Sequence, residues 1–177
     1  MKNKIASFAK PASFVGFKNA DLAWTGALLI VAILAPAILA HTPGNQWITG
    51  TLVNFTLFAA AYKTPLLNAF LVGALPSSIA LMRGLLPASM VLLIPYIMFS
   101  NAILAAIFAS FKKAPLPGVI IASLGKFLFL YGVVFFLAQS LNNSLIFMFS
   151  WPQLATALAG GFIFLGTLKA KELYDKK

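Results

Sequence analysis

The stretch that decides the fold is residues 116–138, LPGVIIASLGKFLFLYGVVFFLA. It is long enough to cross the hydrocarbon core of a bilayer as one helix, which takes about 20 residues. A single charged residue, Lys126, lies near its middle. A cation at that depth costs about 3 kcal/mol or more. Lys126 must therefore face water, carbonyl groups, polar side chains or a ligand, and it is the first candidate for a functional residue.

The composition of the whole chain is that of a multi-pass membrane protein. Of its 177 residues, 61% are hydrophobic and only 9% are charged, whereas a soluble domain has about a quarter charged residues. The chain has no cysteine and one histidine. Disulfides, thiolate metal sites and bis-histidine haem sites within the chain are thereby excluded. We expect no cofactor.

Six apolar runs predict six transmembrane helices in a single integral membrane domain, residues 1–177. The runs are residues 22–40, 47–61, 66–82, 87–111, 116–138 and 151–168. The second run is short for a membrane span, and a re-entrant segment is its alternative. The connection 139–150 is expected to be either a short helix over the mouth of the bundle or a plain loop. The fold class is thus an all-α polytopic membrane protein.

The positive charges indicate the orientation of these spans. With six spans and the N-terminus inside, one side of the membrane carries Lys2, Lys4, Lys10, Lys18, Lys63, Lys112, Lys113, Lys169, Lys171, Lys176 and Lys177. The other side carries only Arg83. Cytoplasmic loops are rich in Lys and Arg, so we predict that both termini are cytoplasmic and that the chain lies in the cell (inner) membrane. Basic residues at span ends favour contact with the lipid bilayer over nucleic acid.

Polar residues inside three of the runs are predicted to meet. Asn54, Asn101 and Lys126 lie at comparable depth, Ser123 lies on nearly the same helix face as Lys126, and Tyr96 offers an aromatic surface. Buried polar groups in lipid need partners. They form either a hydrogen-bonded cluster between helices or a ligand-binding pocket.

The sign of the buried charge indicates the chemistry of a ligand. The chain has three acidic residues, Asp21, Glu172 and Asp175, and all lie outside the apolar runs. A pocket with a buried cation and no buried anion favours a ligand that carries a carboxylate, a phosphate or a strong carbonyl acceptor. Arg83 either draws such an anion towards the mouth or simply anchors its helix at the interface.

Enzymatic function is not expected. The pair Gly125-Lys126 resembles the end of a phosphate-binding P-loop, but Ile120 and Phe127 occupy positions where that motif requires Gly and Ser or Thr. The spans contain no acidic residue, so they offer no set of nucleophile, base and acid.

Small residues and prolines also mark several spans. Ala23 and Ala27, and Thr156 and Gly160, are four residues apart, a spacing that lets helix backbones approach closely. For Thr156 and Gly160 we expect packing within the chain, whereas Ala23 and Ala27 are also candidates for docking another protein. The prolines inside the runs are expected to kink their helices; they are Pro36, Pro76 and Pro95.

The chain resembles the substrate-binding S components of energy-coupling factor (ECF) transporters. The resemblance rests on length, six spans, an Ala-xxx-Ala pair in the first span, and strings similar to a poorly characterised subgroup. These strings are Trp47-Ile48-Thr49-Gly50, Leu75-Pro76-Ser77-Ser78, Gly84-Leu85-Leu86-Pro87, Ile94-Pro95-Tyr96-Ile97-Met98 and Ser150-Trp151-Pro152-Gln153. The resemblance implies capture of a small micronutrient and docking through Ala23 and Ala27 on a membrane T component driven by two cytoplasmic ATPases. It identifies no particular vitamin.

Two other functions stay open at the level of the sequence. One is a self-sufficient small channel or secondary transporter, with Lys126 and Asn101 lining the path. The other is an assembly subunit of a membrane complex that transports nothing.

Overall fold

The computed structural model describes residues 18–39, 42–84 and 88–176, and all regular elements in these ranges are helical. The elements are α1 (Asn19–Leu39), α2 (Asn45–Lys63), α3 (Leu66–Met82), the 3₁₀-helix η1 (Ala88–Leu93), α4 (Ile94–Ser110), α5 (Pro115–Leu137), the 3₁₀-helix η2 (Ala138–Ser140), α6 (Asn143–Met148) and α7 (Trp151–Tyr174). The all-α fold class is confirmed.

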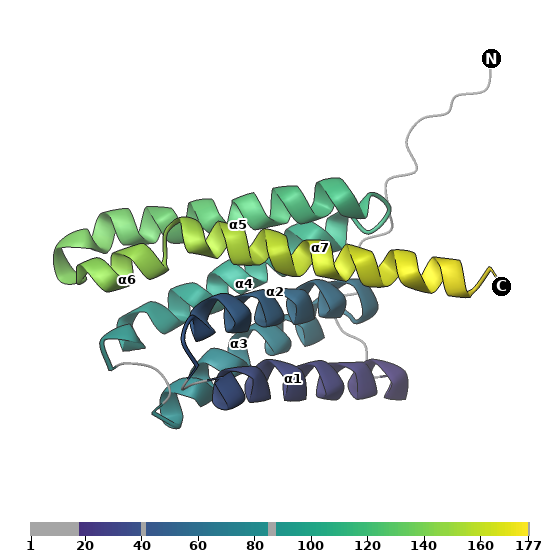
Figure 1. Cartoon of the computed structure of the whole chain (residues 1–177), viewed down its shortest axis with the longest axis horizontal. Coiled ribbons are helices and arrows are strands. Elements are labelled where there is room, and N and C mark those ends of the chain that lie inside the picture. Colours follow the sequence, from purple (N-terminus) through teal and green to yellow (C-terminus); the bar gives the residue numbers. More distant parts are fainter. Residues whose placement is uncertain (1–17, 40–41, 85–87, 177) are drawn as a thin grey trace, which may run out of the picture.

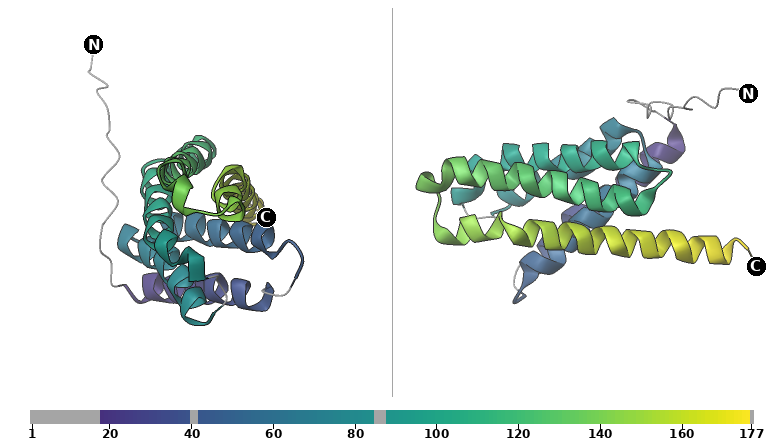
Figure 2. Two further views of the ribbon diagram at one scale, coloured as in Figure 1. Left: turned by 90° about the vertical axis from the view of Figure 1, so that its left-hand side faces the viewer. Right: turned by 90° about the horizontal axis from the view of Figure 1, so that it is seen from above.

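The long helices run back and forth between two ends of the molecule (Figure 1). Asn19 and Tyr174 lie at the same end, together with the α2–α3 and α4–α5 connections; we call this the terminal end. The last turns of α1, α3 and α5 and the first turns of α2 and α7 lie at the opposite end, the far end. Viewed from above, α5 and α7 lie side by side and α2 crosses obliquely beneath them (Figure 2).

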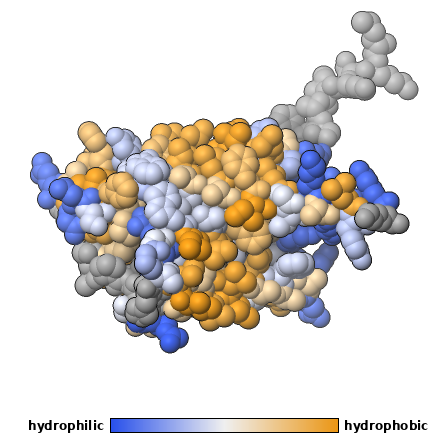
Figure 3. Space-filling model, viewed as in Figure 1, coloured by the Kyte–Doolittle hydropathy of each residue, from blue (hydrophilic) through white to orange (hydrophobic). Residues whose placement is uncertain are grey.

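The surface and the helix lengths are those of a multi-pass membrane protein. Four helical stretches in the described residues are long and apolar enough to cross a bilayer: Asn19–Leu39, Met90–Ser110, Pro115–Leu137 and Asn143–Tyr174. Leu66–Met82 is apolar but shorter. An apolar band covers the middle of the visible face, with hydrophilic residues at both ends (Figure 3). The number of spans and their orientation in a membrane stay predictions.

The second apolar run forms one continuous helix at the centre of the bundle. α2 packs against α1, α3, α4 and α7, and residues from Thr56 to Ala61 are all buried. Polar residues of membrane helices face the interior of the bundle, so a helix that is enclosed by other helices can carry more of them. This location explains why α2 is the least apolar of the long segments.

The fourth run differs from the continuous helix that its sequence suggests. It consists of η1 followed by α4, and Pro95 lies in the first turn of α4. Proline fits there because the first N–H groups of a helix have no partner within the helix. Pro36 and Pro76, in contrast, lie inside α1 and α3 as expected. Pro87, the predicted start of this run, and Ala40, the predicted end of the first, lie outside the described residues.

The connection 139–150 contains a short helix, which decides between the two alternatives left open by the sequence. The Asn142 side chain caps α6 by accepting a 2.9 Å hydrogen bond from the backbone N–H of Leu145. Leu145 and Phe149 are buried and pack with Met90, Leu93 and other apolar residues at the far end.

Towards the terminal end the bundle has a closely packed apolar core. The rings of Phe58, Phe108 and Phe164 contact one another, with centroids 5.0 to 6.3 Å apart. A Cβ atom on Gly160 would lie 2.6 Å from the carbonyl oxygen of Thr51. The expected packing of Gly160 within the chain is therefore confirmed, because α7 approaches the backbone of α2 where only glycine fits.

Candidate functional site

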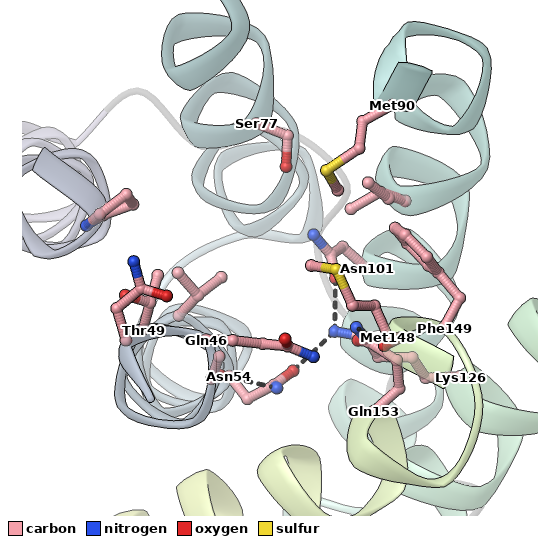
Figure 4. Close-up of a pocket in the computed structure, with 15 residues that line it drawn as sticks. Gln46, Thr49, Asn54, Ser77, Met90, Asn101, Lys126, Met148, Phe149 and Gln153 are labelled. Carbon is pink, nitrogen blue, oxygen red and sulfur yellow. Dashed lines mark hydrogen bonds between the residues drawn. The ribbon is translucent and has the colours of Figure 1, made fainter. Parts of the chain in front are cut away.

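A cavity of about 350 Å³ lies between the helices in the far half of the bundle. We call it the lysine–amide cavity (Figure 4). Its lining consists of Pro36, Asn45, Gln46, Thr49, Gly50, Val53, Asn54, Ser77, Met90, Ile97, Asn101, Lys126, Met148, Phe149 and Gln153. These residues come from α1 to α5, η1, α6, α7 and the α6–α7 connection, so nearly every helix contributes to one chamber.

The three polar residues predicted at comparable depth meet at this cavity. The Nζ atom of Lys126 donates hydrogen bonds of 2.7 Å to Oδ1 of Asn54 and 2.8 Å to Oδ1 of Asn101. The three side chains come from α5, α2 and α4, and each is at most 3% exposed. Both bonds are visible in Figure 4.

Both amides are held so that their oxygens face the ammonium. Nδ2 of Asn101 donates a 2.7 Å bond to the carbonyl oxygen of Gly73 in α3. Nδ2 of Asn54 donates to the carbonyl oxygen of Gly50 at 2.8 Å and to Oγ1 of Thr156 at 3.4 Å. Because each NH₂ group already has an acceptor, each Oδ1 is left to accept from Lys126. The orientation of both amides is therefore fixed by hydrogen bonds within the chain.

The electrostatic character of the site follows from its neutral partners. Asp21 lies in the first turn of α1, and Glu172 and Asp175 lie at the terminal end of α7, so all the acidic residues are remote from the cavity. An ammonium group has three N–H donors, and among the described residues Lys126 uses two of them. Its third donor and its positive charge are available to an anion or a carbonyl oxygen in the cavity.

Two glutamines also belong to the polar lining, and the sequence did not indicate either as a ligand-binding residue. Nε2 of Gln46 is buried without a hydrogen-bond partner in the described part of the chain, and the side chain extends towards Asn54 (Figure 4). Gln153 donates from Nε2 to the carbonyl oxygen of Met148 at 3.1 Å. Gln46 is therefore a second free donor beside the ammonium. Gln46 lies next to Trp47 in the first turn of α2, and Gln153 lies two residues after Trp151 in the first turn of α7. A polar residue near a tryptophan at the end of an apolar run is the sequence signal that could have pointed to these positions.

The structure does not bring Ser123 and Tyr96 into the cavity lining, as far as the described residues go. Ser123 is fully buried, and its hydroxyl has no hydrogen-bond partner among them. Tyr96 is partly buried and packs with the apolar cluster at the far end. Their predicted roles in ligand binding are thus not supported by direct access to the cavity.

The residues predicted to dock a partner lie on the outside of the bundle. Ala23 and Ala27 are exposed on α1, and large apolar side chains of the same helix, including Leu22 and Trp24, are exposed with them. Arg83 is exposed after α3 at the far end. In the described ranges no group of three or more His, Cys, Asp and Glu side chains is placed to hold a metal ion; His41 lies outside those ranges.

Comparisons with known proteins identify no relative of this chain: no family model, no curated protein and no solved structure matches it.

Proposed function

We propose that this chain is a membrane-embedded binding subunit for the uptake of a small micronutrient. In this proposal it resembles an ECF S component, and a separate T component and two cytoplasmic ATPases supply the energy. The observation that carries the proposal is the ammonium group of Lys126, held by two neutral amide oxygens beside a cavity of about 350 Å³. A buried lysine without an acidic partner is costly in a membrane protein. A ligand with an anionic or carbonyl group would compensate part of that cost.

The lining favours a small ligand with an anionic or carbonyl group at one end. Lys126 and Gln46 offer free N–H donors for that group. Met90, Met148 and Phe149 offer apolar surface for the remainder of the molecule. The volume lies near the lower limit of small-molecule sites, which run from about 300 to 1,000 Å³. A compact carboxylate or a carbonyl-bearing ring suits these dimensions.

The closed floor of the cavity favours a binding subunit over a channel that works alone. Between Lys126 and the terminal end, the bundle is filled by the packed apolar core. In this core Phe58 and Phe108 are fully buried and Phe164 is 3% exposed. A solute cannot pass these rings unless the bundle rearranges. A partner that reorients the subunit in the membrane would provide release without a permanent pore.

The proposed topology has six spans with the far end outside and the terminal end in the cytoplasm. Lys63, Lys112, Lys113, Lys169 and Lys171 lie at the terminal end, in accord with the positive-inside rule. Trp47 and Trp151, whose ring centroids are 5.1 Å apart, lie at the far end, where indoles suit the membrane interface. The lysine–amide cavity then faces the side from which a nutrient is taken up.

The test is to identify what the chain carries. The protein is purified in mild detergent, and small molecules released from it are measured by mass spectrometry, with Lys126→Met purified in parallel. We expect a compound with a carboxylate, phosphate or carbonyl acceptor that is retained by the wild type and missing from Lys126→Met. The proposal fails if the folded wild type retains no solute and binds none from a library of anionic micronutrients. Solute flux through the purified chain alone in liposomes would instead favour a channel.

A further inference from the structure

A second cavity, of about 580 Å³, lies at the terminal end of the bundle. We call it the basic cavity. Its lining consists of Tyr62, Lys63, Lys112, Lys113, Pro115, Leu165, Leu168, Lys169, Lys171, Glu172 and Asp175. It lies between the end of α2, the α4–α5 connection and the last turns of α7, and it shares no residue with the lysine–amide cavity.

The charge of this lining calls for an anion. Five lysines and two carboxylates line the cavity, so the positive charges outnumber the negative ones by three. Lys112 is partly buried, and desolvation by burial lowers the pKa of its ammonium group. An anion in the cavity would offset both the mutual repulsion of the lysines and the desolvation of Lys112.

The lysines come from separate segments and point to one concave site. Lys112 and Lys113 belong to the α4–α5 connection, whereas Lys169 and Lys171 belong to α7. The ammonium of Lys63 lies 5.7 Å from the ring centroids of both Trp24 and Tyr62, which holds it at the end of α2. A general excess of basic residues in loops does not require that lysines from three separate segments line the same cavity.

The cavity also has an apolar wall, which indicates the source of the anion. Pro115, Leu165 and Leu168 line it beside the lysines, and both leucines are partly buried. The terminal end is where the apolar band of the surface gives way to hydrophilic residues (Figure 3). A site with ammonium groups and an apolar wall at this level suits a phosphate attached to acyl chains better than a soluble phosphate.

We propose that the basic cavity binds the phosphate headgroup of an anionic phospholipid. The ammonium groups contact the phosphate, and the apolar wall contacts the start of the acyl chains. This site is independent of the proposed uptake function, because it needs neither the lysine–amide cavity nor a solute.

The test is a lipid titration followed by native mass spectrometry of the full chain in detergent. The wild type receives phosphatidylglycerol or phosphatidylcholine, each with and without an excess of inorganic phosphate. The variant Lys112→Gln/Lys169→Gln removes two charges from the cavity. Its matched control, Lys18→Gln/Lys176→Gln, removes two charges from exposed positions that are not in the lining.

We expect the wild type to retain phosphatidylglycerol in preference to phosphatidylcholine, even with inorganic phosphate present. We expect the cavity variant to bind phosphatidylglycerol about tenfold more weakly or worse, and the control variant to bind like the wild type. Equal retention of both lipids by the wild type would overturn the proposal without reference to any variant. Equal losses in the two variants, or displacement of the lipid by inorganic phosphate, would also overturn it.

Discussion

The side chain of Lys126 crosses the bundle from α5 and donates a 2.7 Å hydrogen bond to Asn54 of α2, a residue 72 positions earlier in the chain. α2 packs mainly against α7 and α1, and α5 mainly against α4 and α7, rather than against each other. The long lysine side chain therefore bridges a space that helix packing alone leaves open. The same space continues towards the far end as the lysine–amide cavity, and Lys126 and Asn54 line it.

Replacing Lys126 by Met is expected to remove ligand binding but not the fold. Methionine has a similar length and removes the cost of burying a charge, which is on the order of several kcal/mol. It also leaves Oδ1 of Asn54 and Oδ1 of Asn101 without the lysine donor, at a cost of about 1 to 3 kcal/mol each, so the two effects offset each other and the fold is kept. Losing a charged hydrogen bond to the ligand should weaken its binding about 10- to 100-fold. Thermal unfolding in detergent and retention of the co-purified solute measure the two effects. Lys18→Met, at an exposed lysine, controls for charge. A destabilised variant that still holds the solute would contradict the assignment.

Placing a carboxylate beside the ammonium should neutralise the site. In Asn101→Asp a carboxylate replaces the amide whose Oδ1 lies 2.8 Å from Nζ of Lys126. The new anion would pair with the lysine and exclude an anionic ligand, so retention of the solute should fall about tenfold or more. The carboxylate loses the amide donor to Gly73, which limits any gain in stability.

The same substitution should become harmful once the lysine is gone. Asn101→Asp in the Lys126→Met background buries a carboxylate without a cation, and we expect a further loss of about 3 kcal/mol relative to Asn101→Asp alone. Unfolding of the two single variants and the double variant gives the coupling between the positions. Additive effects would show that the two side chains do not interact, against the 2.8 Å bond.

The meeting of Asn54, Asn101 and Lys126 was predictable because amides and a lysine inside apolar runs have few alternatives. Each lies in a segment that must be helical in a membrane, and a buried polar group needs a partner at its own depth. Depth follows from position along a helix, so the sequence alone brings the three together. Their binding role stays a prediction, because proximity does not reveal a ligand.

Ser123 and Gln46 show where this reasoning ends. Ser123 lies three residues from Lys126 on nearly the same face, but its short side chain ends among packed helices, whereas the lysine extends to the cavity. Gln46 precedes the apolar run, so it reads as part of a connecting loop, although α2 already begins at Asn45. Helix starts and side-chain reach depend on packing between segments, which periodicity does not report.

Gly73→Ala should disturb the site from a distance. A Cβ atom at this position would lie 2.8 Å from Cδ2 of Leu57 and 2.9 Å from Cβ of Asn101. Because the added methyl group overpacks the contact between α3 and α4, we expect a loss of about 1 to 3 kcal/mol in stability and weaker solute retention. Both are measured as for Lys126→Met.

Gly132→Ala in α5 is the matched control for this prediction. Its Cβ atom would meet nothing within 4 Å, so the variant should be neutral or up to about 1 kcal/mol more stable, through the higher helix propensity of alanine. If the two variants behave alike, the close approach of Gly73 to Asn101 does not matter for the site.

Ala23→Trp is expected to block transport and leave solute binding intact. Ala23 is exposed on α1, so tryptophan fits without disturbing the bundle, but it prevents the close backbone approach that small residues permit. Uptake by the chain together with its proposed T component and ATPases, in parallel with retention by the chain alone, separates the two effects. Ala37→Trp places the same side chain at another exposed position of α1 and should transport normally. The control shares the helix, the membrane and the added bulk, so a block that occurs only in Ala23→Trp is specific to that position. Normal transport by Ala23→Trp would remove the docking role from this face.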